Sequence, residues 1–77
     1  MTERNEYDYS LLMSRIKKKY GTMTNFAKAM ECSKSVISMR LNNNADWHRT
    51  DVMKAVKLLD IPETQVYSFF YTLKVEK

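Results

Sequence analysis

Residues 22 to 43, which read TMTNFAKAMECSKSVISMRLNN, contain two short amphipathic segments joined by a connection of only a few residues. Thr22 precedes the first segment and Ser33 precedes the second. Both are good helix N-caps, because a hydroxyl oxygen can accept a hydrogen bond from an unpaired backbone N–H of the first turn. The pattern predicts a helix over about 23 to 31, a tight turn and a helix over about 34 to 42. This arrangement is a helix-turn-helix.

The apolar residues of both segments fall on one side of each predicted helix. Phe26, Ala27 and Met30 share a side of the first helix, and Ile37 and Leu41 stand four residues apart in the second. Ala27 suits this geometry, because two helices that cross steeply around a short turn leave little room at their closest approach. We therefore expect these five residues to form the centre of the core.

A further helix is predicted before this motif. Asp8 or Ser10 can cap it, and it runs to about Tyr20, since apolar residues repeat along it at helical spacing. Gly21, the only glycine, follows directly and can close the helix in the left-handed conformation.

Two more helices are predicted after the motif. Asp46 or Thr50 could cap a helix that ends near Asp60. Pro62 is well placed to begin the next one, in which Val66, Phe69 and Phe70 turn inward. The chain is therefore predicted to be all-α, a compact bundle of about five short helices.

The predicted domain organisation is simple. We expect residues 1–7 to be a flexible N-terminus, residues 8–71 to form the helix-turn-helix domain and residues 72–77 to be a tail or short strand. The last segment alternates polar and apolar side chains, which favours an extended strand. Such a strand would have to pair with another chain or lie against the helices, and disorder is the alternative.

Composition excludes several classes of protein. Seventy-seven residues form one small domain, and a single cysteine, Cys32, with a single histidine, His48, leaves no internal disulfide and no structural zinc site. We expect no metal, no cofactor and no enzymatic activity, since no nucleophile and base are seen to pair. The N-terminus is too polar for a signal peptide and no apolar run is long enough to span a membrane, so a cytoplasmic location is expected.

Positive charge is concentrated in the middle of the chain. From Arg15 to Lys57 there are ten basic and three acidic residues, whereas the two ends together carry three basic and six acidic residues. Such asymmetry is typical of a surface that meets phosphates, although solvated helix surfaces also carry many lysines.

The chain resembles phage regulators of the lambda-repressor-like, Cro/repressor (XRE) type. The residues that carry the resemblance are FAKAM at 26–30, ECS at 31–33 and SVISMRLN at 35–42. The spacing to Trp47 and the closing LLDIPETQVYSFF at 58–70 resemble a group of small phage-encoded Cro-like members. The resemblance spans about residues 7 to 75, and it implies a transcriptional regulator that binds a palindromic operator in double-stranded DNA as a homodimer.

In such a motif the second helix enters the major groove while the preceding helix crosses the DNA backbone. The side chains opposite the core face of helix 34–42 are the candidate base readers, and Ser35, Ser38 and Met39 match positions where the family reads bases. Polar residues at the start of the preceding helix and around the end of the second are candidate phosphate ligands. The full set of candidates is Thr24, Asn25, Lys34, Ser35, Ser38, Met39, Arg40, Asn42 and Asn43, with Asn44 extending it.

Three positions depart from the family pattern. Glu31 stands where the family usually has a turn glycine, so it must adopt positive φ or shift the turn. Met23 stands where many relatives have glutamine, and Met39 lies in the middle of the reading face, and neither side chain can donate a hydrogen bond.

Methionine is frequent on surfaces that bind proteins, so a second function stays open. In that alternative the scaffold serves a repression modulator or antirepressor that binds a cognate phage repressor and masks its DNA-reading face.

Overall fold

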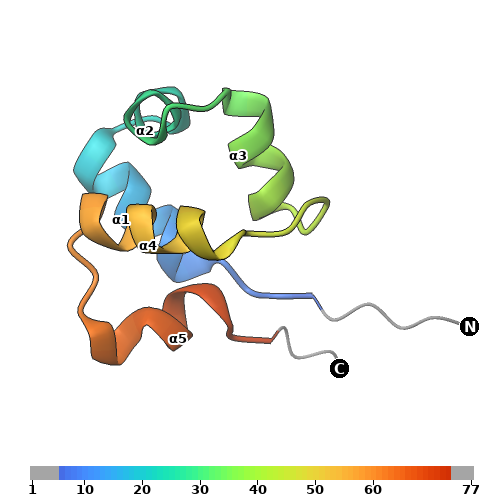
Figure 1. The fold of residues 1–77 in the computed structure, drawn as a ribbon, viewed down its shortest axis with the longest axis vertical. Coiled ribbons are helices and arrows are strands. Elements are labelled where there is room, and N and C mark those ends of the chain that lie inside the picture. Colours follow the sequence, from blue (N-terminus) through green and yellow to red (C-terminus); the bar gives the residue numbers. More distant parts are fainter. Residues whose placement is uncertain (1–5, 74–77) are drawn as a thin grey trace, which may run out of the picture.

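The computed structural model describes residues 6–73, and these form five α-helices and one 3₁₀ turn (Figure 1). α2 and α3 lie at one end of the molecule, α4 crosses the middle in front of α1, and α5 closes the opposite end. The prediction of an all-α bundle of about five short helices is confirmed. The elements are α1 (Ser10–Tyr20), α2 (Met23–Met30), α3 (Lys34–Leu41), α4 (Arg49–Leu58), the 3₁₀ turn η1 (Glu63–Gln65) and α5 (Val66–Phe70).

The caps of the helix-turn-helix are those that the sequence predicts. The hydroxyl oxygen of Thr22 accepts a hydrogen bond from the Asn25 N–H at 3.1 Å, and that of Ser33 accepts one from the Val36 N–H at 3.2 Å. Each bond satisfies a donor that the first turn of a helix leaves without an intrahelical partner. These two caps fix where α2 and α3 begin.

The turn between α2 and α3 contains a strained residue. Glu31 has φ 64° and ψ 39°, the left-handed conformation that favours glycine. Of the two alternatives expected at this position, a positive φ or a shifted turn, the structure has the positive φ. Lys54 supports the turn from α4, because its Nζ donates to the Met30 carbonyl at 3.1 Å and pairs with the Glu31 carboxylate at 3.5 Å.

A single core joins all five helices. Ala27 is 2% exposed, as expected for a small residue at the crossing of α2 and α3. A large apolar side chain stabilises the fold by about 1.5–3 kcal/mol when it is fully buried. The buried residues are Tyr9, Leu12, Ile16, Phe26, Ala27, Met30, Ile37, Leu41, Val52, Ala55, Leu59, Ile61, Phe69 and Phe70.

Two predicted details of α4 and α5 are wrong. Neither Asp46 nor Thr50 caps α4, because His48 occupies the N-cap position and makes no side-chain cap bond. Pro62 does not begin an α-helix but precedes η1, which continues directly into α5. Both errors concern local boundaries and leave the buried face of each helix unchanged.

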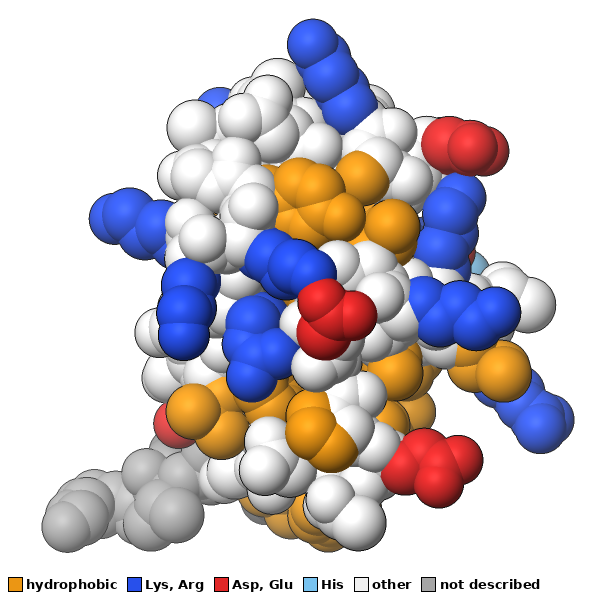
Figure 2. All heavy atoms as spheres, turned by 90° about the vertical axis from the view of Figure 1, so that its left-hand side faces the viewer, with side chains coloured by type: hydrophobic (Ala, Val, Ile, Leu, Met, Phe, Trp, Pro, Cys, Tyr) orange, Lys and Arg blue, Asp and Glu red, His pale blue; other side chains and the backbone are white. Residues whose placement is uncertain are grey.

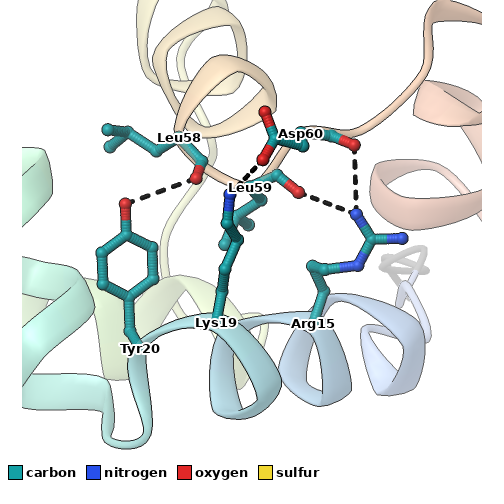
Figure 3. Close-up of polar contacts among 6 residues, drawn as sticks. All are labelled: Arg15, Lys19, Tyr20, Leu58, Leu59 and Asp60. Atoms are coloured by element: carbon teal, nitrogen blue, oxygen red, sulfur yellow. Dashed lines mark hydrogen bonds and ion pairs between the residues drawn. The ribbon is translucent and has the colours of Figure 1, made fainter.

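Basic side chains of α1 hold the C-terminal end of α4 (Figure 3). Arg15 Nη1 donates to the carbonyl oxygens of Leu59 at 2.7 Å and Asp60 at 3.1 Å, and Lys19 pairs with the Asp60 carboxylate. Cations at this position satisfy carbonyls that lack helical partners and interact favourably with the helix dipole. The hydrogen bond and charge of Lys19 hold the pKa of Asp60 below its ordinary value.

The two ends of the described chain run side by side (Figure 1). Tyr7 and Leu73 form an isolated antiparallel bridge, and the Asp8 N–H donates to the Thr72 carbonyl at 2.7 Å. Tyr7, which we expected in a flexible N-terminus, is therefore tied to the C-terminal segment. Residues 1–5 and 74–77, on which most of the predicted flexible N-terminus and tail strand fall, lie outside the described residues.

Candidate functional site

The outer side of α3 has the exposure expected of a surface that reads DNA. Ile37 and Leu41 are buried, whereas Lys34, Ser35 and Met39 are exposed. Among the other candidates, Thr24, Asn25 and Asn42 are exposed and Ser38 is half-buried. The helix-turn-helix thus brings these candidates to the surface, as their helical positions predict.

Some of these polar side chains already donate hydrogen bonds to nearby backbone carbonyls of the protein. The Asn42 Nδ2 donates to the Ser38 carbonyl at 2.9 Å, and the Asn25 Nδ2 donates to the Tyr20 carbonyl at 2.9 Å. Such local bonds would compete with bonds to bases or phosphates. Lys34 is the exposed cation in the first turn of α3.

Arg40 does not fit the predicted role of phosphate ligand. Its side chain is only 12% exposed, its Nη2 lies 3.1 Å from the Asp51 carboxylate, and its guanidinium lies 5.6 Å from the centroid of the Trp47 ring. The guanidinium of Arg40 is therefore paired within the protein, where it links α3 to Asp51 of α4. The sequence predicts that Arg40 extends the phosphate contacts, and helical spacing alone could not reveal its pairing with Asp51 of α4.

Asn43 does not fit that role either. Its side-chain oxygen accepts a hydrogen bond from the Tyr7 N–H at 2.9 Å, and its Nδ2 donates to the Tyr7 carbonyl at 3.1 Å. Both polar atoms of the amide are thus engaged with the N-terminal segment. These bonds could not be expected from the sequence, because the partner lies 36 residues away.

Fewer basic side chains of the central segment are available to bind phosphates than the number of lysines and arginines suggests. Arg15, Lys19, Arg40 and Lys54 all bind carboxylates or carbonyls of the protein itself. Figure 2 shows the face on the left of Figure 1, away from α3, and there basic side chains are scattered among apolar side chains and a few acidic ones. The pairing of these four cations within the protein weakens the argument from charge for a phosphate-binding surface.

A cleft of about 520 Å³ lies between the chain ends and the loop before α4. Five aromatic side chains form most of its apolar wall, and we call it the aromatic cleft. Its rings are in contact: Trp47 and Phe70 have centroids 5.2 Å apart, and Tyr7 and Tyr71 meet edge to face at 6.2 Å. The lining residues are Tyr7, Tyr9, Asn43, Ala45, Asp46, Trp47, His48, Arg49, Phe70 and Tyr71.

The aromatic cleft combines apolar surface with polar groups of both signs. Asp46 and Arg49 contribute opposite charges, and the tyrosines contribute hydroxyls. Burial raises the pKa of the Tyr9 phenol, and Tyr7, Asp46 and Tyr71 raise it further. The Tyr9 phenol therefore stays neutral near pH 7. Tyrosine hydroxyls can donate as well as accept hydrogen bonds.

Sequence reasoning missed this cleft. It assigned Phe69 and Phe70 to the core, which is correct, but did not connect Phe70 with Tyr7 and Tyr9 near the other end of the sequence. A signal was present, because six of the nine aromatic residues lie near the two ends of the sequence: Tyr7, Tyr9, Tyr67, Phe69, Phe70 and Tyr71.

The described residues offer little for other kinds of site. Across residues 6–73, every helix is too short or too polar to cross a bilayer. Within the same range, no three or more His, Cys, Asp or Glu side chains are grouped so that they could hold a metal ion.

Comparison with known proteins identifies the family. A family model described as "Protein of unknown function (DUF739)" matches residues 5–73. This family model is not one of the Cro/repressor type, so it does not support the predicted membership of the Cro/repressor group. A search of curated proteins gives no match.

A solved structure is similar over nearly the whole chain. It is the solution structure of the modulator of repression (MOR) of the temperate bacteriophage TP901-1 from Lactococcus lactis. The sequences are 37% identical, the match covers 91% of this chain and 95% of the other, and the TM-score is 0.76. The matching family model and this similarity agree, and the chain belongs to the family described as protein of unknown function DUF739.

Proposed function

We propose that this chain is a modulator of repression: a small phage regulatory protein that binds a cognate repressor protein and hinders its action on DNA. The observation that carries the proposal is the similarity to the phage modulator at 37% identity and a TM-score of 0.76. It favours a protein partner, the alternative that the sequence left open, over operator DNA. Such a protein would act by binding rather than by catalysis, and in the cytoplasm.

The aromatic cleft is the surface best suited to a protein partner. Tyr71 is 40% exposed and lines the cleft beside Tyr7 and Trp47. Tyr and Trp are enriched among residues that dominate binding energy, because they bury a large apolar area and still offer a polar group. Neighbouring Asp46 and Arg49 can supply the polar rim typical of such interfaces.

Binding to the phage's own repressor tests the proposal. Isothermal titration of the purified chain with that repressor is expected to show a complex, and adding the chain to a labelled operator–repressor complex is expected to release the operator. Tyr71→Ala should weaken binding at least tenfold, because a central interface aromatic contributes about 2 kcal/mol or more. Met39→Ala, which truncates an exposed side chain on α3, is the matched control and should leave binding unchanged.

The outcomes separate the possibilities. If Met39→Ala abolishes binding and Tyr71→Ala does not, the repressor contacts α3 and the proposed surface is wrong. If the repressor does not bind at all, the proposed function is wrong.

Direct DNA binding is the second candidate, favoured by the exposed Lys34, Ser35 and Met39 on α3. It would require a homodimer to read a palindromic operator, so a monomeric mass in sedimentation would count against it. Its affinity would also fall steeply as salt rises, because counterion release drives phosphate binding.

A further inference from the structure

The side-chain amide of Asn43 hydrogen-bonds to the backbone of Tyr7 in the way that a residue of a neighbouring β-strand would. It accepts from the Tyr7 N–H at 2.9 Å and donates to the Tyr7 carbonyl at 3.1 Å, so one amide pairs with both backbone groups of one residue. A primary amide can do this because it carries an acceptor and donors in one plane. Tyr7 is thereby fixed to the turn that follows α3.

The backbone at Asn43 is also unusual. Its φ is 64°, and its N–H donates to the Arg40 carbonyl at 3.3 Å, while the next N–H, of Asn44, donates to the Met39 carbonyl at 2.8 Å. Asparagine accepts the left-handed conformation more readily than most residues other than glycine. Position 43 therefore needs both a tolerant backbone and an amide side chain.

Tyr7 is held on a second side by the C-terminal segment. It pairs with Leu73, and the Asp8 N–H donates to the Thr72 carbonyl at 2.7 Å. The ring of Tyr7 meets Tyr71 edge to face at 6.2 Å and lies 6.2 Å from Tyr9. The bonds to Asn43 thus set the place of a ring that forms one wall of the aromatic cleft.

We propose that Asn43 is a positioning residue that makes the N-terminal segment around Tyr7 a wall of the partner-binding cleft. The proposal rests on the proposed function and assigns the turn after α3 a role in shaping a protein-binding site instead of a role in contacting phosphates. Asn43 then affects the affinity for the partner indirectly, because it holds Tyr7 in place. The partner itself contacts the tyrosine rings.

Asn43→Gly is the sharpest test. Glycine keeps the left-handed backbone and removes only the amide, whereas Asn44→Gly removes the neighbouring amide and serves as the matched control. Two quantities are measured on the folded proteins: hydrogen exchange of the Tyr7 amide, and affinity for the phage repressor. Circular dichroism confirms that the helices remain.

The expected results are specific. Asn43→Gly should speed exchange of the Tyr7 amide at least tenfold and weaken repressor binding at least tenfold, with neither change in Asn44→Gly. Asn43→Asp, which can still accept from the Tyr7 N–H but cannot donate to its carbonyl, should fall between Asn43→Gly and the wild type.

Three results would overturn the proposal. Unchanged Tyr7 exchange in Asn43→Gly would show that the amide does not hold the segment. Lost affinity with unchanged exchange would mean that Asn43 touches the partner directly, and unchanged affinity with fast exchange would remove the N-terminal segment from the site. If the wild type binds no repressor, the proposed function fails, and with it the role in binding, whereas Tyr7 exchange still reports whether Asn43 holds the segment.

Discussion

Replacing Arg40 by alanine is expected to destabilise the fold without changing the salt dependence of any DNA binding. Arg40 is the basic residue of α3 whose role differs most between sequence and structure. From the sequence it is a phosphate ligand, whereas in the structure it pairs with Asp51 at 3.1 Å and lies over Trp47 at 5.6 Å. The two roles predict opposite results.

The magnitude follows from the surroundings of Arg40. Its side chain is 12% exposed and that of Asp51 is 28% exposed, so the pair lies between exposed pairs, worth about 0.2–1 kcal/mol, and fully buried ones. The contact with the Trp47 ring adds about 0.5–2 kcal/mol. Among the described residues the buried Arg40 Nε has no acceptor, which offsets part of this gain. We expect a loss of about 2 kcal/mol, or roughly 10 °C in Tm for a domain of this size.

Thermal unfolding followed by circular dichroism measures this loss. Arg40→Lys keeps the charge but lacks the planar group that stacks on an indole, so it should recover only part of the stability. Arg49→Ala removes an exposed arginine and should change stability by less than about 0.5 kcal/mol. A Tm for Arg40→Ala within 2 °C of the wild type, combined with a shallower salt dependence of duplex binding, would refute the internal role.

Three further predictions concern the turn, the α1–α4 contact and the core. Glu31→Gly should be about 1 kcal/mol more stable than Glu31→Ala in denaturant unfolding, because both lack the exposed ion pair but only glycine relieves the positive φ; equal stabilities would argue against strain. The pKa of Asp60 is lowered in the folded state, so the stabilisation is present above about pH 4 and is lost as pH falls through the folded pKa. The Tm difference between wild type and Lys19→Met should therefore vanish near pH 2, and a difference that persists there would contradict the assignment. Phe26→Ala should cost about 3–5 kcal/mol and leave little folded protein by circular dichroism, whereas a folded variant with near-native Tm would show that Phe26 does not anchor the core.

The parts of the fold that could be predicted are those set by near neighbours in the sequence. The hydroxyls of Thr22 and Ser33 each accept a hydrogen bond from the N–H three residues further on, and Gly21 closes α1 with φ 82°. The burial of Ile37 and Leu41 follows from helical spacing alone. Caps and periodicity act over a single helical turn, so the residues themselves carry the information.

The candidate site could not be predicted because it depends on distant contacts. The place of Arg40 is decided by Asp51, which comes from α4, and that of Asn43 by Tyr7 at the start of the described chain. The aromatic cleft forms only because the two chain ends run side by side, joined by the bridge between Tyr7 and Leu73. The spacing of apolar residues along a helix does not indicate which distant segments pair, such as those of Tyr7 and Leu73.

The most direct test of the account follows the single Trp47 indole N–H by NMR while the 15N-labelled chain is titrated first with the phage repressor and then, separately, with duplex operator DNA. The account predicts that the repressor shifts the Trp47 indole and the Tyr7 and Tyr71 amides, and that DNA at physiological salt leaves the Ser35 amide of α3 unmoved. Salt-sensitive shifts at Ser35 with DNA, together with an unmoved indole in the presence of repressor, would contradict it.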